Sequence, residues 1–258
     1  MLAHGILSQM QYAAEAAAAP TWVTDGLVAY WDANNTDSYS GTGDTWTDLS
    51  GNGYDLAKQG GSVSFTGASG GDPAYFGITN SDFYWRNTTD AALAQFAGTD
   101  CTILGLVSVP SFSNPGYWAA ATVNGNISGT LKGTYRTNIG QSSAATVRNQ
   151  VWDNVDDAYS ATSAAALTTN TFFFLGFTTE WGTAHQAWIN ASTSGTPAST
   201  GTIPSSPTTN AFAVGHSFYA RGDSSDQFTG KISAVMVYSK VLSSEEMTQN
   251  YDYITGQY

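Results

Sequence analysis

The pattern that most constrains the fold begins at Trp22, where short apolar runs alternate with clusters of glycine, asparagine, aspartate and serine. The runs are rich in β-branched and aromatic residues, which favour strands, and the clusters are typical of turns. No long helical pattern separates the runs, so parallel strands joined by helices are disfavoured. A low-complexity stretch at 191–210, ASTSGTPASTGTIPSSPTTN, predicts a polar loop. The clearest predicted strands are Leu27–Asp32, Thr102–Val109, Gly116–Thr122, Val147–Trp152, Thr171–Thr178, Ala184–Asn190, Ala211–His216 and Gln227–Tyr238. We therefore predict an all-β fold, a two-sheet antiparallel jelly-roll sandwich.

A short helix is predicted near the N-terminus. Apolar residues recur at helical spacing from Ile6 to Ala17 and Pro20 closes the segment, which favours a helix over residues 5–18. Because a helix of this length is marginal alone in water, it needs a surface to pack against. We interpret residues 1–20 as an N-terminal helical anchor segment and residues 21–258 as one jelly-roll domain.

A second short helix is predicted near the C-terminus. Ser243 and Glu246 have the spacing of a capping box, so a helix should begin there, and Gly256 should end it. The apolar face that should pack against the sandwich is formed by Met247, Tyr251 and Ile254.

The charge balance disfavours nucleic acid as a partner. The chain has 8 basic and 20 acidic residues, a formal net charge of −12, and this negative field repels phosphate backbones. Only 11% of the residues are charged, so the surface should be mostly neutral and polar. Cys101 is the only cysteine, so no intrachain disulfide can form, and it is expected to be an inert thiol in the core or at a strand edge.

The first twenty residues do not have the pattern of a secretory signal or of a membrane span. No lysine or arginine precedes the apolar stretch, and polar residues interrupt it. We therefore expect no membrane partner and a protein made in the cytoplasm. Export stays open as the alternative, because the alanines at 17–19 can mimic a cleavage site.

Two segments resemble the ends of laminin-G-like, concanavalin-A-type jelly-roll domains. The opening is GLVAYWDANNTDSYSGTGDTWTDLSGNGYDL at 26–56, and the closing strand and capped helix are FTGKISAVMVYSKVLSSEEMT at 228–248. Between them, TILGLVSV and FFFLGFTTEWGTAHQAWINAS resemble a central strand and a hairpin of the family, so the resemblance spans about residues 26–250. The stretch SYSGTGDTWTDLSGNG is most similar to versions in virion proteins of tailed bacteriophages.

The motif WTDLSGNG also has a physical interpretation. Gly51 and Gly53 permit a positive φ in a tight turn, and Asp48 and Asn52 can cap backbone donors there. The two tryptophans of the opening are expected to anchor the core and are Trp31 and Trp46.

The sequence argues against an enzyme. Glycosidases of this fold carry two catalytic carboxylates on one strand, because cleavage needs an acid and a nucleophile about 5 Å apart. Outside the two predicted helices the only glutamate is Glu180, beside Trp181. A glycoside hydrolase or lyase that uses Glu180 or an aspartate pair is therefore a weaker alternative.

Calcium is the ion that the polar loops would suit, because it prefers hard oxygen ligands. One cluster is formed by Asp153, Asn154, Asp156 and Asp157, and a second by Asp32, Asn34, Asn35 and Asp37. Of these, Asp153, Asp156 and Asp157 are the candidate calcium ligands. The alternative interpretation of each cluster is a solvated turn.

For glycans, sandwich lectins use aromatic rings that stack on sugars, together with polar side chains. Strand alternation places Arg148, Gln150 and Trp152 on one face of one strand and Gln186, Trp188 and Asn190 on one face of another. We expect these two sets to line a concave sheet. The alternative interpretation is aromatic packing under a loop or against a partner protein.

The resemblance implies a non-enzymatic accessory or structural protein of a tailed-phage virion, either a capsid decoration or a tail-associated module. Its outward jelly roll would bind host or surface glycans. Its partners would be other virion proteins or further copies of itself, such as a trimer, held through the N-terminal segment. The alternative is a stand-alone carbohydrate-binding module.

Overall fold

The computed structural model describes residues 21–59, 63–79, 84–87, 99–113, 116–122, 135–139, 145–152, 158–164, 166–203, 211–216 and 228–258. The predicted helix at 5–18 lies outside these residues, so the boundary between an anchor and a domain stays a prediction. None of the helices in the described part is long and apolar enough to cross a membrane.

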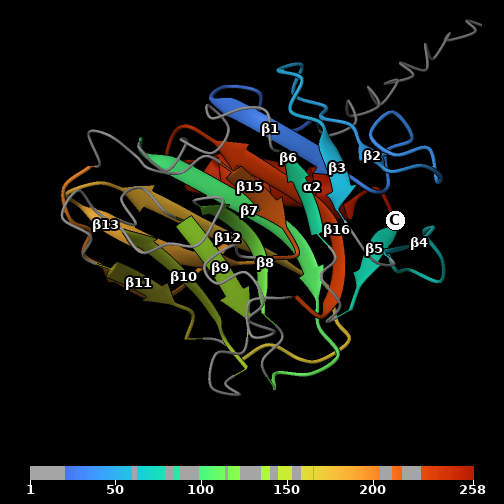
Figure 1. Ribbon diagram of the computed structural model, residues 1–258. Coiled ribbons are helices and arrows are strands. Elements are labelled where there is room, and N and C mark those ends of the chain that lie inside the picture. The colour runs from blue at the N-terminus through green and yellow to red at the C-terminus, as the bar shows by residue number, and fades with distance from the viewer. Residues whose placement is uncertain are drawn as a thin grey trace, which may run out of the picture.

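Two antiparallel sheets form the molecule (Figure 1). The first sheet, sheet A, has the order β14 (Ser192–Ala198), β13 (Ala184–Ile189), β12 (Phe173–Glu180), β7 (Cys101–Ser108), β16 (Gly230–Tyr238), β5 (Tyr75–Ile78) and β4 (Ser64–Thr66), with β1 (Leu27–Asp32) also paired to β16. The second sheet, sheet B, has the order β11 (Ala158–Thr162), β10 (Val147–Trp152), β9 (Tyr135–Ile139), β8 (Tyr117–Thr122), β15 (Ala211–Val214), β6 (Tyr84–Asn87), β3 (Leu56–Gln59) and β2 (Thr45–Trp46). The predicted antiparallel sandwich is confirmed.

The main core lies between the two sheets and is rich in aromatic rings. Trp31 and Trp46 are fully buried in it, which confirms their predicted role as anchors. Trp31 stacks on Phe212 of the opposite sheet, with ring centroids 5.5 Å apart. Cys101 is also fully buried, and burial raises the pKa of its thiol to about 12, so it stays protonated and inert.

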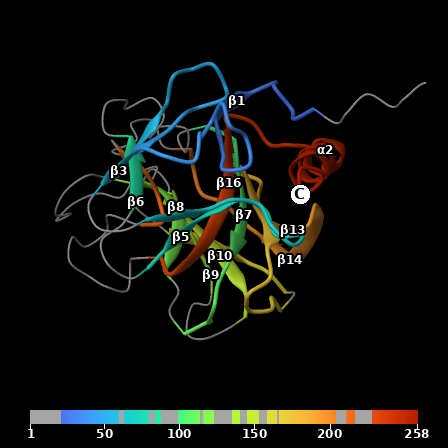
Figure 2. The ribbon, with the colours of Figure 1, turned by 90° about the vertical axis from the view of Figure 1, so that its right-hand side faces the viewer.

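A second, smaller core covers the outer face of sheet A. Helix α2 (Ser244–Thr255) lies against this face, as Figure 2 shows. The predicted capping box is present, because Ser243 Oγ accepts from the N–H of Glu246 and the Glu246 side chain accepts from the N–H of Ser243. The predicted apolar face is confirmed, and the helix side chains that pack in this second core are those of Met247, Tyr251 and Ile254.

The WTDLSGNG motif fastens a loop to β1 through the buried carboxylate of Asp48. Its Oδ1 accepts from the N–H groups of Tyr30 and Ser50, and its Oδ2 accepts from the Ser50 hydroxyl and the N–H of Tyr54. The two glycines at positions 51 and 53 adopt φ values of 87° and 77°, as expected. The expected role of Asn52 is wrong, because its amide donates to the carbonyls of Leu27 and Val28 instead of capping donors.

The predicted loop at 191–210 is wrong in its first half. Residues Ser192–Ala198 form the edge strand β14, which pairs with β13 through a two-residue turn at Asn190 and Ala191. Both turn residues have positive φ, 48° and 59°, which suits the twist of a tight hairpin. The serine- and threonine-rich composition concealed a strand whose residues are mostly solvent-facing.

Candidate functional site

The predicted glycan residues on β10 lie on the outer face of sheet B. Arg148 and Gln150 are half-buried, while the alternate residues Asn149 and Val151 are buried between the sheets. The Arg148 guanidinium donates to Ser160 Oγ on the neighbouring strand β11 over 2.9 Å. Trp152 ends β10, and its side chain lies outside the described part of the structure. A role of this strand in binding stays a prediction.

The predicted glycan residues on β13 serve structural roles. Trp188 is buried in the second core under α2, and its Nε1 donates to Thr178 Oγ1 over 3.1 Å. Gln186 is also buried, and its amide donates to the carbonyls of Ala187 and Ser194. The turn residue Asn190 accepts from the N–H of Phe174. The apolar face of α2 packs in the same core as this ring, which the sequence suggested would be open to a sugar.

The two sets therefore do not share one concave surface, and that expectation is wrong. The β10 side chains lie outside sheet B, whereas Gln186 and Trp188 lie outside sheet A. Alternation correctly places each set away from the core between the sheets, but it cannot assign two strands to the same sheet.

The predicted calcium ligands Asp153, Asp156 and Asp157, together with Asn154, lie outside the described residues. In the second cluster the Asp32 carboxylate is buried and already accepts from Tyr30 Oη, from Gln257 Nε2 and twice from Asn34. Asn34 Oδ1 accepts from the N–H of Ala74. This second cluster is a hydrogen-bonded turn. No group of three or more acidic, histidine or cysteine side chains suited to a metal occurs in the described ranges.

A groove on the outer face of sheet A, beyond the end of α2, is the strongest candidate site. We call it the β5–β16 groove, and it encloses about 290 Å³. It lies where β4 and β5 meet the start of β16, at the end of the molecule near the C-terminus in Figure 1. The residues that line it are Ser64, Thr66, Tyr75, Gly77, Ile78, Thr79, Ser108, Pro110, Asn170, Thr229, Gly230 and Lys231.

Strand alternation on β5 builds one side of this groove. Phe76 and Ile78 are buried between the sheets, so the alternate residues Tyr75 and Gly77 face outward. Tyr75 is half-buried and gives the groove an aromatic side. Gly77 has no side chain, so nothing fills the groove above the backbone at this position.

A single row of residues crosses the groove floor from strand to strand. Ser64 pairs with Gly77, Gly77 pairs with Lys231, and Lys231 pairs with Ser108. Directly opposed residues in antiparallel strands have Cβ atoms about 5 Å apart on the same face of the sheet. The cross-strand neighbours of Lys231 are therefore small on both sides, namely Gly77 and Ser108. They leave room for a ligand to contact its ammonium group.

Aromatic rings hold the Lys231 side chain in place. Its Nζ lies 4.6 Å from the centroid of the Tyr75 ring and 5.7 Å from that of Phe172. The two rings are themselves in contact, with centroids 5.8 Å apart. Cation–π contacts of this kind orient the ammonium group without neutralising its charge.

Sequence reasoning did not single out Tyr75, Ser108 or Lys231. The strand β5 lies between clusters of glycine, serine and aspartate, and it is too short to give a clear alternating pattern. A usable signal was present at Lys231, which is a charged residue within the otherwise apolar closing strand of a chain with only 8 basic residues.

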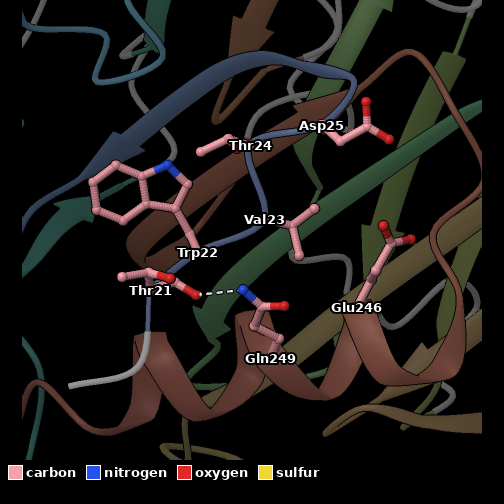
Figure 3. A pocket seen from close by; sticks show the side chains of 7 residues that line it. All are labelled: Thr21, Trp22, Val23, Thr24, Asp25, Glu246 and Gln249. Atoms are coloured by element: carbon pink, nitrogen blue, oxygen red, sulfur yellow. Dashed lines mark hydrogen bonds between the residues drawn. The ribbon is translucent and has the colours of Figure 1, made fainter. Parts of the chain in front are cut away.

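A second groove, of about 540 Å³, lies between the segment Thr21–Asp25 and α2 (Figure 3). Gln249 Nε2 donates to the Thr21 carbonyl over 2.8 Å, and the N–H of Val23 donates to Asn250 Oδ1 over 2.9 Å. The two acidic side chains in this groove, those of Asp25 and Glu246, are both paired with Lys240. The hydrogen bonds attach the start of the described chain to the helix. Because both carboxylates are already paired with Lys240, neither needs a ligand to balance its charge.

The glutamates do not form the paired carboxylates of a glycosidase within the described residues. Glu180 is exposed at the end of β12, where the hairpin to β13 begins. Glu245 and Glu246 both serve the N-terminal cap of α2. The described glutamates therefore serve a structural role or stand alone.

An antiparallel two-sheet sandwich with a polar, aromatic-sided groove on one outer face defines a jelly-roll domain of the lectin-like class. A family model described as the concanavalin A-like lectin/glucanases superfamily matches residues 95–248, which is more than half of the chain. The chain belongs to this superfamily. No curated protein matches it.

Solved structures that share the fold include binding domains of clostridial toxins. The binding domain of botulinum neurotoxin serotype D is 13% identical with a TM-score of 0.59, and the alignment covers 89% of this chain and 52% of that one. A botulinum neurotoxin type C structure, described with cell entry that depends on two ganglioside molecules, is 13% identical with a TM-score of 0.61 and coverage of 90% and 52%. The binding domain of Paraclostridial Mosquitocidal Protein 1 is 14% identical with a TM-score of 0.60 and coverage of 88% and 52%. This chain spans about half the length of these structures, and at these identities the likeness shows the fold alone.

Proposed function

We propose that this protein is a non-enzymatic glycan-binding module, and that the β5–β16 groove is its binding site. The observation that carries the proposal is the pairing of an aromatic ring with a cation on the outer face of sheet A, where Lys231 Nζ lies over the Tyr75 ring, 4.6 Å from its centroid. Aromatic rings bind the apolar face of a sugar, and nearby polar groups fix its hydroxyls.

The rest of the groove suits a hydroxylated ligand. Its rim offers the exposed side chains of Thr66, Thr79 and Asn170, and none of the lining residues that the structure describes is acidic. Hydroxyl and amide groups can both donate and accept hydrogen bonds, as sugar hydroxyls require. The described glutamates lie in the α2 cap and the β12 hairpin, so a binding role is favoured over hydrolysis.

The similarity to solved structures is a second, less specific argument for a binding function. The solved structures of the same fold include toxin binding domains, one of them described with ganglioside molecules. Because the chain spans about half of each, these descriptions motivate a screen of glycans and do not identify the ligand.

The proposal is tested by measuring glycan binding with an immobilised glycan panel, followed by calorimetry on the best hits. Tyr75→Ala should reduce the affinity by at least about tenfold, because a buried stacking contact contributes on the order of 1.5 kcal/mol. Tyr75→Phe keeps the ring and should retain most of the affinity.

A matched control on the opposite face of the molecule is Gln150→Ala on β10. If Gln150→Ala abolishes binding while Tyr75→Ala leaves it intact, the site lies on sheet B and the proposed groove is wrong. Release of reducing sugar from any bound polysaccharide would contradict the non-enzymatic role.

A finer role, as an accessory protein of a tailed-phage particle, is proposed on the resemblance of residues 38–53. The fastening of Thr21 and Val23 to α2 supports it, because it fixes the chain near one end of β16 while the groove lies at the other end. Lys231 and Tyr238, whose hydroxyl donates to the Val23 carbonyl, are seven residues apart on β16, or about 23 Å. An attached module would thus present its groove away from the attachment point.

Deletion of residues 1–19 tests this finer role. The shortened chain should keep the melting temperature of the full chain but should no longer join particles in an assembly assay. Unchanged incorporation would contradict an anchoring role for the N-terminal segment.

A further inference from the structure

We infer that the β5–β16 groove selects glycans that carry a carboxylate, and that Lys231 binds this group. The inference rests on the proposed glycan-binding function and names the class of sugar. Among the described residues that line the groove, Lys231 is the only one with a charged side chain. Uronic acids and sialic acids are two common kinds of sugar that present such a carboxylate.

The pairing of the lysines sets Lys231 apart. Three lysines lie in the described ranges, and two of them form ion pairs: Lys58 lies 2.7 Å from Asp44, and Lys240 lies within 2.8 Å of both Asp25 and Glu246. Lys231 pairs with no carboxylate among the described residues, and its contacts are with the rings of Tyr75 and Phe172. The chain has 20 acidic residues and 8 basic ones, so most lysines should find an acidic partner within the protein. A groove lysine with no such partner among the described residues is left to pair with a carboxylate of a ligand.

The net charge of −12 makes this arrangement selective for a compact anionic group. At physiological salt, charges more than about 8 Å apart are largely screened, so an acidic sugar in the groove is attracted by Lys231 while distant acidic residues repel it weakly. Long polyanions such as nucleic acids would extend beyond the groove onto the acidic surface and are disfavoured.

Ser108 supplies a second group for the same ligand. It is the cross-strand partner of Lys231 on β7, and its residue is 2% exposed. Its hydroxyl has no hydrogen-bond partner in the described part of the protein, although buried hydroxyls are nearly always paired. A change of rotamer about χ1 would turn this hydroxyl toward a carboxylate held by Lys231, where it can donate one hydrogen bond.

The experiment uses two acidic probes and their uncharged counterparts of the same shape. The probes are 3′-sialyllactose and its methyl ester, and trigalacturonic acid and its methyl ester. Binding to the full chain is measured by calorimetry at low and physiological salt. At least one acid should bind roughly tenfold tighter than its ester, because a charge-assisted hydrogen bond contributes about 1.5 kcal/mol or more. The two pairs distinguish a sialic acid from a uronic acid as the source of the carboxylate.

Variants then assign the effect to Lys231. Lys231→Gln should bring the ratio of acid affinity to ester affinity to about one, and Lys231→Arg should retain most of the preference for the acid. Lys58→Gln makes the same change of net charge on β3 of the other sheet and should not alter binding. Ser108→Ala should lower the ratio of acid affinity to ester affinity by a few-fold.

The outcomes separate this inference from the proposed function. If neutral glycans bind in a Tyr75-dependent way and each acid binds no better than its ester, the carboxylate inference is wrong while the glycan-binding function stands. If an acid is preferred but Lys231→Gln keeps the preference, Lys231 is not the carboxylate-binding group and the inference is overturned. If no probe and no panel glycan binds, the proposed function and this inference fail together.

Discussion

The ring nitrogen Nε2 of His185 lies 2.9 Å from Nδ2 of Asn149, so one hydrogen bond joins β13 of sheet A to β10 of sheet B across the core. The other ring nitrogen, Nδ1, lies 2.8 Å from Thr179 Oγ1. Since the Asn149 amide nitrogen can only donate, Nε2 accepts and Nδ1 carries the proton that it donates to Thr179. The imidazole is therefore neutral and has both nitrogens satisfied.

This contact predicts that the protein loses stability in mild acid. Burial lowers the pKa of His185 from its ordinary value of 6.5 to about 4. Between these values the unfolded chain binds a proton that the folded chain does not, so stability is highest above pH 6.5 and falls as the pH drops toward 4. We expect a loss of roughly 3 kcal/mol from this group, measured by urea unfolding from pH 7 to 4.

The control for the histidine is His185→Gln, which keeps one acceptor and one donor but cannot titrate. The variant should be less stable at pH 7 and should show a shallower decline of unfolding free energy over the same range. Parallel pH profiles for the two proteins would show that other groups, such as the carboxylates, cause the decline.

Asp48 is predicted to be a major stabilising residue of the opening motif. Its buried carboxylate accepts four hydrogen bonds, one from the N–H of Tyr30 on β1 and three from Ser50 and Tyr54 in the loop after β2. Asp48→Asn replaces one acceptor oxygen by a donor, which faces N–H groups that also donate. We expect a loss of about 2–4 kcal/mol in the free energy of unfolding. Asp37→Asn makes the same charge change at an exposed position and should cost less than about 0.5 kcal/mol.

The sequence predicted best the strands whose residues are buried on both faces or alternate clearly. The strands β1 and β10 begin and end at the predicted residues, β7 and β12 differ from the prediction by one or two residues at each end, and β16 begins three residues later than predicted. The strands β7, β12 and β16 lie in the interior of sheet A, where burial on both faces forces a continuous apolar pattern, whereas β10 alternates between buried and half-buried residues. The strands β4, β5 and β14 lie at or near a sheet edge, and their solvent-facing residues resemble a loop.

The candidate site was harder to predict, because it depends on which strands are neighbours. Lys231 pairs with Gly77 and Ser108, which lie 154 and 123 positions away in the chain (231 − 77 and 231 − 108). Alternation gives the face of each residue but not the order of the strands. For the same reason Trp188 was interpreted as an open aromatic, since nothing in its own strand indicates that α2 covers it.

Trp188 provides a prediction that separates packing from binding. Trp188→Ala should lower the free energy of unfolding by about 3–5 kcal/mol, because the indole fills the second core beside Met247 and Leu104. Trp188→Phe should cost less and should keep the full affinity for any glycan that binds the wild type. Loss of binding in a Trp188→Phe protein that remains folded at the assay temperature would restore the interpretation of this ring as a ligand contact.

Gly105 offers a test of the main core that does not depend on backbone strain. A Cβ atom at this position would lie 2.3 Å from Cζ3 of Trp118, which is fully buried, and φ of Gly105 is not positive. Gly105→Ala therefore forces the indole to move within a close-packed interior, at an expected cost of about 1–3 kcal/mol or more. Gly53→Ala is the matched control, because its φ of +77° costs about 1 kcal/mol while nothing lies within 4 Å of the added methyl group. If urea unfolding shows Gly53→Ala to be the more damaging change, the opening turn limits stability more than the packing of Trp118 does.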